Sequence, residues 1–191
     1  VHINIKPVPR GEGFQFNNAV TGGAIPKQYI PAVEAGVKEY LAQGPLGFPV
    51  VDLAVEVFDG KYHDVDSNEM AFKLAARLAM SEGMPQCNPV LLEPVMLVHI
   101  HVPTAATSRA QQVVTGRRGQ ILGFEAREGW KGWDTVQAHM PQAEILDLVS
   151  ELRSLSQGVA SFEAKFDHLQ ELSGRPAEQV IEERKGQLEA A

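Results

Sequence analysis

Apolar and polar residues alternate in the first half of the chain with the period of a half-buried β-strand. Val1, Ile3 and Ile5 are separated by polar residues, and residues 50–58 repeat this alternation with valines and a leucine on one face. A third, shorter strand is predicted around residues 14–16. The three strands predict a small sheet with one buried face.

Two segments of the first half have helical spacing. The first begins at about Pro31, carries Val33, Val37 and Leu41 on one face, and ends near Gly44. Proline suits the first turn of a helix, where its missing N–H is not needed. A glycine in the middle of this helix costs about 1 kcal/mol relative to alanine, which suggests close packing against another element.

The second helix follows a short polar turn. Asp66 is expected to cap it, with Glu69 three residues later as in a capping box. Met70, Leu74 and Leu78 form an apolar stripe, beside which three alanines repeat at the same spacing. We therefore expect this helix to pack closely on the sheet.

The second half predicts a ferredoxin-like domain. Residues 85–94 contain three prolines and are typical of a stiff connector. The pattern then predicts strand, helix, strand, strand, helix, strand, an order typical of a split βαβ sandwich with both helices on one face of a four-stranded antiparallel sheet. These elements are expected at residues 95–102, 108–115, 120–127, 133–140, 144–155 and 159–168.

Alternation on the last three of these strands indicates which side chains face the helices. The expected inward residues are Leu122, Phe124, Ala126, Val136, Ala138, Met140, Phe162, Ala164 and Phe166. A charged tail helix is predicted at about residues 176–189, outside a ferredoxin-like core at about 94–170. The chain is therefore expected to be an α+β protein of two domains, at residues 1–88 and 89–191.

Composition narrows the classes of function. Among 191 residues, 44% are apolar and 21% charged, and no apolar run approaches the roughly 18 to 20 residues of a membrane span. The formal net charge of −7 argues against a broadly basic nucleic-acid-binding surface, so any RNA contact is expected to be local. A single cysteine, Cys87, excludes an intramolecular disulfide and fits either a reducing cytoplasm or a cysteine-poor secreted protein. The first residue is not methionine, which suggests a piece of a longer chain.

The turn before the second helix is the main candidate site. It is expected to project as a rigid polar tip that contacts a partner. His63, Asp64 and Asp66 could alternatively bind Zn or Mn, but a metal site needs three or four converging ligands, and we expect none here. The residues of this tip are Lys61, Tyr62, His63, Asp64, Val65 and Asp66.

Three other groups have two possible interpretations each. His99 and His101 share one strand face, which with Gln137 and His139 gives either an open polar face or a weak histidine site; the open face is preferred. Arg117 and Arg118 follow a helix and face water or an acidic partner. Two tryptophans, at 130 and 133, stack on a base or hold a hairpin together.

The residues do not support covalent catalysis or nucleotide hydrolysis. The chain lacks a Gly-x-Ser-x-Gly nucleophile elbow and a Cys-His arrangement. It also lacks a Gly-x-x-x-x-Gly-Lys-Ser/Thr loop for phosphates. We therefore assign no catalytic residue and no cofactor.

Several longer motifs resemble bacterial elongation factor G. The first half resembles its fourth domain, and the second half resembles its fifth. The motifs that carry the resemblance are Gly22-Gly23-Ala24-Ile25-Pro26-Lys27-Gln28-Tyr29-Ile30-Pro31, Gly44-Pro45-Leu46-Gly47-Phe48-Pro49, Asp59-Gly60-Lys61-Tyr62-His63-Asp64-Val65-Asp66-Ser67, Pro89-Val90-Leu91-Leu92-Glu93-Pro94, Arg117-Arg118-Gly119 and Leu152-Arg153-Ser154-Leu155-Ser156-Gln157-Gly158.

This resemblance implies a fold and a function. The first domain is expected to have a βαβ fold like the second domain of ribosomal protein S5. The family implies a cytoplasmic, monomeric translation factor that binds the ribosome, with the tip at tRNA and mRNA during translocation and Arg117 and Arg118 as possible contacts to rRNA. GTP and Mg would belong to an N-terminal GTPase domain that this chain lacks. The alternatives are a paralogue acting in ribosome protection or recycling, or a metal-dependent enzyme that uses the His/Asp turn.

Overall fold

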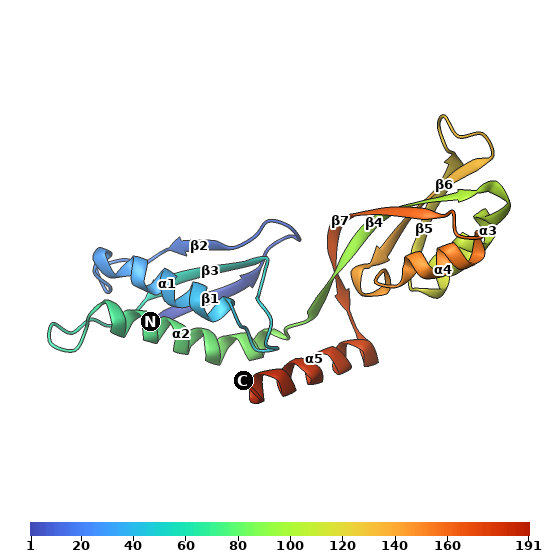
Figure 1. Ribbon diagram of the computed structural model, residues 1–191. Helices are drawn as coiled ribbons and strands as arrows, with labels where there is room; N and C mark the ends of the chain where they lie inside the picture. The colour runs from blue at the N-terminus through green and yellow to red at the C-terminus, as the bar shows by residue number, and fades with distance from the viewer. The chain divides into compact units, whose positions relative to one another are not determined.

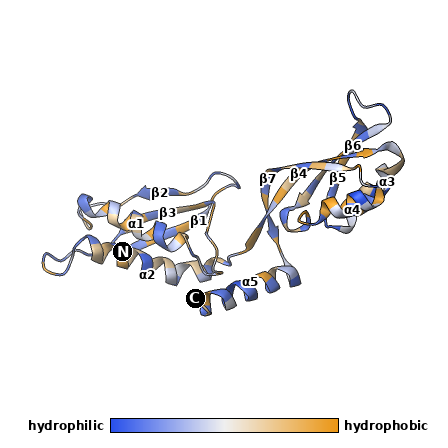
Figure 2. Ribbon diagram, viewed as in Figure 1, coloured by the Kyte–Doolittle hydropathy of each residue, from blue (hydrophilic) through white to orange (hydrophobic).

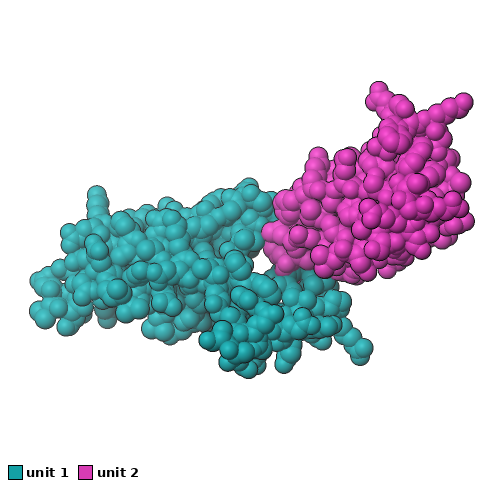
Figure 3. Space-filling view, in the orientation of Figure 1, with its two compact units in different colours: residues 1–91, 172–191 teal, residues 92–171 magenta.

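The computed structural model describes residues 1–191 as two compact units (Figures 1 and 3). Unit 1 comprises residues 1–91 and 172–191, and unit 2 comprises residues 92–171. The sequence-based division kept the C-terminal helix with the second domain. By its contacts this helix, α5 (Gly174–Glu189), belongs to unit 1.

Unit 1 contains a three-stranded sheet and two long helices. Its strands are β1 (His2–Pro7), β2 (Gln15–Asn18) and β3 (Leu53–Asp59). β3 is central, antiparallel to β1 and parallel to β2. The helices are α1 (Ile30–Leu41) and α2 (Glu69–Gly83), each flanked by a short 3-10 turn, Lys27–Tyr29 before α1 and Met84–Cys87 after α2.

The core of unit 1 lies between the two helices and the sheet. Val33 and Val37 of α1 are fully buried, as predicted, and so are Val55 and Val57 of β3 to within 1%. Gly36 lies where α1 crosses α2, and a Cβ atom there would collide with the Lys73 carbonyl oxygen and lie 2.9 Å from the Ala76 Cβ. The predicted close packing at this glycine is confirmed.

The predicted inward stripe of α2 was wrong. Met70, Leu74 and Leu78 are 59%, 52% and 60% exposed. The buried residues of α2 are Phe72, Ala76 and Met80. Both sets repeat every four residues, and an offset of two residues places them on opposite faces of a helix. The periodicity alone could not decide which set faces the sheet.

Unit 2 has a four-stranded sheet in the order β5-β6-β4-β7. β6 is antiparallel to both β4 and β5. This order, with one helix after the first strand and one before the last, confirms the ferredoxin-like fold. The elements are β4 (Leu91–Pro103), α3 (Thr107–Gly116), β5 (Gln120–Ala126), β6 (Trp133–Pro141), α4 (Leu148–Leu155) and β7 (Ser161–Leu172), with 3-10 turns at Thr104–Ala106 and Gln142–Glu144.

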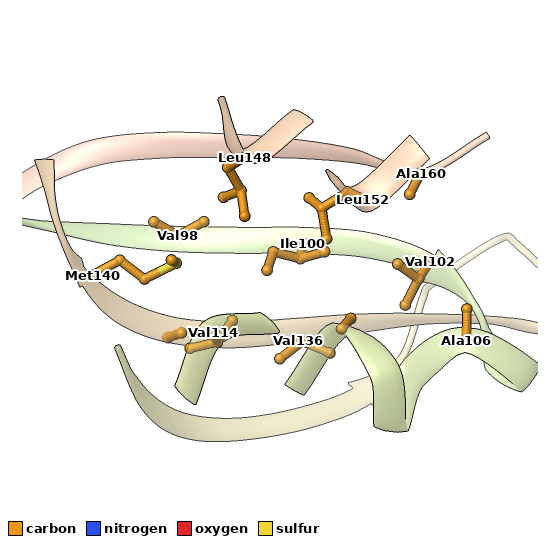
Figure 4. Packing of buried hydrophobic residues seen from close by; sticks show 12 residues of the cluster. Val98, Ile100, Val102, Ala106, Val114, Val136, Met140, Leu148, Leu152 and Ala160 are labelled. Carbon is orange, nitrogen blue, oxygen red and sulfur yellow. The ribbon is translucent and has the colours of Figure 1, made fainter. Parts of the chain in front are cut away.

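The core of unit 2 joins the two central strands to both helices (Figure 4). Val98 and Ile100 of β4 face Leu148 and Leu152 of α4, and all four are fully buried. Val136 on the neighbouring strand β6 pairs with Ile100 and is also fully buried. The face of β6 was therefore predicted correctly.

The inward face predicted for the edge strand β5 was wrong, and that predicted for the edge strand β7 was only partly right. Leu122, Phe124 and Phe166 are 46%, 58% and 59% exposed. The pairing of β5 with β6 shifts between Ile121 and Gly123, and one extra residue in a strand moves its neighbours to other positions. On β7, Phe162 packs against the core as predicted, whereas Ala164 and Phe166 are exposed.

α5 is fixed to unit 1 near the end of α1. The Arg184 Nε donates a hydrogen bond of 2.9 Å to the Gly47 carbonyl oxygen. Its guanidinium carbon lies 5.4 Å from the centre of the Phe48 ring. These contacts join segments that are far apart in the sequence. None of the helices, α5 included, is both long and apolar enough to cross a membrane.

Candidate nucleic-acid interface

The predicted tip is the loop of residues 60–68 between β3 and α2, which we call the tip loop (Figure 1). It projects from the end of unit 1 at which the N-terminus lies, and most of its residues are hydrophilic (Figure 2). β3 is the central strand of the sheet and α2 supplies part of the core. Both ends of the loop therefore start from rigid elements.

Aromatic packing fixes the first half of the tip loop. Tyr62 lies against Tyr29, with ring centroids 5.8 Å apart, and Tyr29 stacks on the buried Phe72 at 4.9 Å. Gly60 is packed so closely that a Cβ atom would lie 2.7 Å from Ile25 Cδ1. These contacts hold the base of the loop on the core of unit 1.

A closed turn fixes the second half. The His63 backbone N–H donates to Ser67 Oγ at 3.0 Å, and the Ser67 N–H donates to the His63 carbonyl oxygen at 3.0 Å. The next residue, Asn68, caps α2, because its side-chain oxygen accepts the Ala71 N–H at 2.8 Å. The predicted cap at Asp66 was therefore wrong: Asp66 lies in the turn, two residues before the cap.

The turn presents its side chains to solvent. Lys61, His63, Asp64 and Asp66 are exposed, and Val65 is 93% exposed. The side chains of Lys61 and His63 form no hydrogen bond or ion pair within the chain. This arrangement offers one fixed cation, one imidazole and one apolar group at a site with a defined backbone.

Asp64 influences the ionisation of Tyr62. A hydrogen bond to the Asp64 carboxylate, then desolvation, raises the pKa of the Tyr62 phenol above its ordinary value. The phenol O–H is therefore used within the tip loop. His63, Asp64 and Asp66 do not belong to any converging group of metal-ligating side chains, which gives the metal interpretation of the tip no geometric support.

Arg117 links the two helices of unit 2. Its guanidinium donates to Asp147 Oδ1 at 2.6 Å and to Glu151 Oε2 at 2.6 and 2.8 Å, and also to the Glu144 carbonyl oxygen at 2.8 Å. The hydrogen bond from Arg117 is the main reason that the pKa of Asp147 lies below its ordinary value. Only 16% of the Arg117 side chain is exposed, so its donors are already occupied within the protein.

Arg118 is more accessible. It pairs with Glu93 at 2.8 Å and with Glu144 at 3.1 Å, while 41% of its side chain remains exposed. Hydrogen bonding to Glu93 is the largest influence on its pKa, which is raised. Of the two arginines that the sequence singles out, Arg118 has the larger surface available to a partner.

The histidines of β4 are part of a polar sheet face. His101 Nδ1 lies 2.9 Å from Thr135 Oγ1, and its Nε2 lies 3.9 Å from Glu163. Burial, followed by the charge of Arg127, lowers the pKa of His101. Neither His99 nor His101 belongs to a converging metal-ligating group.

The two tryptophans hold a hairpin together. Trp130 and Trp133 meet edge to face with centroids 5.3 Å apart, and the Arg127 guanidinium lies 4.0 Å from the Trp130 ring centre. The Arg127 N–H donates to the Trp133 carbonyl oxygen at 2.8 Å. Mutual stacking of these side chains supports the structural interpretation over base stacking.

Several residues that shape the tip loop were not predicted from the sequence. Tyr29 and Phe72 support the loop from other elements, a contact that sequence spacing does not reveal. Asn68 had a visible signal, because asparagine is among the preferred N-cap residues, but the nearby Asp66 with Glu69 matched the capping-box spacing.

Comparison with known proteins gives consistent matches for both units. Residues 1–88 match the family model for elongation factor G, domain IV, and residues 90–180 match that for the elongation factor G C-terminus. An elongation factor G-like protein of Synechocystis sp. (strain ATCC 27184 / PCC 6803 / Kazusa) is 62% identical over 172 residues, which are 90% of this chain and 26% of that protein.

A solved structure is similar as well. A crystal structure of a protein from Thermus thermophilus superposes with a TM-score of 0.86 at 34% identity, covering 96% of this chain and 27% of that one. The chain thus spans about a quarter of the length of these two proteins.

Proposed function

Because this chain belongs to the elongation factor G family, we propose that it is the ribosome-contacting C-terminal part of a translation factor that promotes movement of tRNA and mRNA. The tip loop is the contact to tRNA and mRNA. The observation that carries the proposal is the tip itself, whose exposed side chains lie on a loop fixed at both ends. No group of this chain performs the hydrolysis of GTP, which belongs with Mg to another part of the parent protein.

The charge of the chain supports a local contact to RNA. With a net charge of −7, the surface cannot gather many phosphates by bulk attraction. The tip loop holds Lys61 beside Asp64 and Asp66, so its own charge is also not positive. Recognition would then rest on single contacts: Lys61 with a phosphate, and the His63 ring with an unpaired base, since imidazole rings stack on splayed bases.

The rigidity of the tip loop suits a mechanical role. Packing of Tyr62 on Tyr29 and the paired hydrogen bonds between His63 and Ser67 limit the conformations of the loop. A loop that is already ordered loses little conformational entropy on binding. It would therefore hold its place beside moving RNA without having to fold on contact.

In unit 2, we assign different roles to the two arginines. Arg117 supports the fold through its carboxylate partners, whereas Arg118 offers its exposed portion to rRNA. A phosphate would have to compete with Glu93 and Glu144 for the Arg118 guanidinium. Its contribution to ribosome affinity is therefore expected to be smaller than that of an unpaired arginine.

A chimera tests the proposal. In the chimera, this chain replaces the matching region of the Synechocystis relative. Single-turnover translocation is then measured on ribosomes with tRNA and mRNA. His63→Ala and Lys61→Ala are expected to slow translocation about tenfold or more, because each removes a contact made only at the tip. Lys185→Ala, an exposed lysine on α5, is the matched control and is expected to leave the rate unchanged.

The same variants separate the alternatives. Unchanged translocation in both tip variants would remove the tip loop from the mechanism. A chimera that does not translocate but splits ribosomes, or relieves inhibition by tetracycline, would instead assign the chain to a recycling or ribosome-protection factor. Ribosome pelleting with a GTP analogue shows whether a loss of rate reflects lost binding.

A further inference from the structure

Three potential metal ligands converge in unit 2, away from the tip loop. His139 lies on β6, and Asp167 and His168 lie on β7. One ligand atom from each lies within 4.8 Å of the other two. His139 Nε2 is 3.5 Å from Asp167 Oδ2, and His168 Nδ1 is 2.6 Å from the same oxygen.

From this geometry we propose that His139, Asp167 and His168 bind a divalent transition-metal ion, such as Zn²⁺ or Co²⁺. Two imidazoles and one carboxylate are a donor set that suits these ions. Three protein ligands leave a coordination position for water or an exogenous ligand. This site is independent of the proposed contact between the tip loop and RNA.

Binding of an ion requires only a small change in the distances between the three ligands. Zinc ligands at about 2.0–2.2 Å in tetrahedral geometry lie about 3.3 Å from one another. The separation of 3.5 Å between His139 and Asp167 is already close to this value. The pair His168 and Asp167 must open from 2.6 Å to bind one ion.

The positions are accessible and lie on two strands. The side chains of His139, Asp167 and His168 are 26%, 36% and 38% exposed, so an ion can enter from solvent. The two imidazole rings lie edge to face, with centroids 5.3 Å apart. Because the ligands come from two strands, a bound ion would link β6 to the edge strand β7.

One cation lies near the three ligands. Lys165 is two residues before Asp167 on β7, and it is exposed, so its ammonium group can lie in solvent when an ion binds.

Titration of the untagged 191-residue chain with Zn²⁺ tests the site. Isothermal calorimetry and metal analysis are expected to give one equivalent. Co²⁺ is expected to give visible absorption bands of a nitrogen- and oxygen-ligated ion. His139→Ala and Asp167→Asn are each expected to weaken binding about tenfold or more, and the asparagine keeps the size of the side chain.

Two further histidine variants are the controls. His99→Ala, on the neighbouring strand, and His63→Ala, in the tip loop, are expected to bind one equivalent as the unchanged chain does. Tryptophan fluorescence of each variant shows whether unit 2 is folded, since Trp130 and Trp133 both lie there. Absence of binding to the unchanged chain, binding that persists in His139→Ala and Asp167→Asn, or binding lost in His63→Ala would each overturn the proposal.

Discussion

A single arginine sets the ionisation of a neighbouring carboxylate in unit 2. Arg117 extends from the end of α3 to Asp147 and Glu151 at α4. Such pairs at a surface contribute little to stability at neutral pH, because solvent screens them. Their effect is clearer in a titration, which follows one carboxyl group at a time.

Arg117→Gln is expected to return the pKa of Asp147 toward its ordinary value of 3.8, because the hydrogen bond that lowers this pKa is lost. In the unchanged chain, the pair stabilises the fold above about pH 4, and this contribution disappears as pH falls through the lowered pKa of the folded state. The variant should lose stability less steeply in this acidic range. Carboxyl ¹³C NMR gives the pKa, and denaturant unfolding at several pH values gives the slope.

Arg118→Gln is the matched control for this titration. Its partners are Glu93 and Glu144, so the pKa of Asp147 should not change. An equal change of the Asp147 pKa in both arginine variants would mean that the general positive charge, and not the hydrogen bond, lowers it.

At the scale of elements, the two helices of unit 1 approach closely because α1 has a glycine at their crossing. The Gly36 position faces the backbone of α2 at Lys73. An ion pair from Lys73 to Glu39 also joins the two helices outside the core. The interface thus depends on the absence of one side chain more than on the surface charges beside it.

Gly36→Ala is expected to destabilise the chain by about 1 to 3 kcal/mol, because the new methyl group collides with backbone that must move. The cost of this collision is expected to outweigh the stabilisation of about 1 kcal/mol that alanine otherwise brings to a helix interior. Denaturant unfolding followed by tyrosine fluorescence measures the difference. Gly186→Ala in α5, where a Cβ meets no atom within 4 Å, should instead leave stability equal or slightly increased. Equal stabilisation by both alanines would contradict the crossing seen here.

The buried face could be predicted from the sequence for some elements and not for others. Alternation placed Val55 and Val57 of β3 correctly, and the spacing of Val33 and Val37 gave the buried face of α1. These segments have one apolar face only, which leaves a single choice. α2 has two apolar faces. Its contacts with α1 and with Tyr29 decide which of the two is buried.

The candidate site was predictable in its position but not in its support. A polar run between an apolar strand and a helix predicted the exposed loop at His63. The partner of Tyr62 lies more than thirty residues away in sequence, and no local pattern indicates it. The inward face of β5 was predicted incorrectly for a similar reason. The bulge between Ile121 and Gly123 depends on pairing with β6.

At the scale of the whole molecule, the two units carry different chromophores. Tyr29, Tyr40 and Tyr62 all lie in unit 1, whereas Trp130 and Trp133 lie in unit 2. Unfolding of each unit can therefore be followed in the same sample. α5 belongs with the tyrosine-containing unit although it follows the tryptophan-containing unit in sequence.

Deletion of residues 174–191 is expected to lower the Tm reported by tyrosine and leave that reported by tryptophan unchanged. The deletion removes the hydrogen bond and the cation–π contact of Arg184 and exposes the surface that α5 covers. For domains of this size, each kcal/mol lost lowers Tm by about 4 °C or more. Arg184→Ala should give a smaller decrease in the same signal. A decrease confined to the tryptophan signal would place α5 with the other unit.

The return of the chain to unit 1 has a consequence for its biosynthesis. Residues 1–91 leave the ribosome before residues 92–171, but the last helix of unit 1, with Arg184, is made only after residues 92–171. At about 5–20 residues per second, the nascent unit 1 waits on the order of ten seconds with the surface around Gly47 and Phe48 uncovered. During that interval unit 2 can complete its own core. Completion of unit 1 thus follows the synthesis of unit 2.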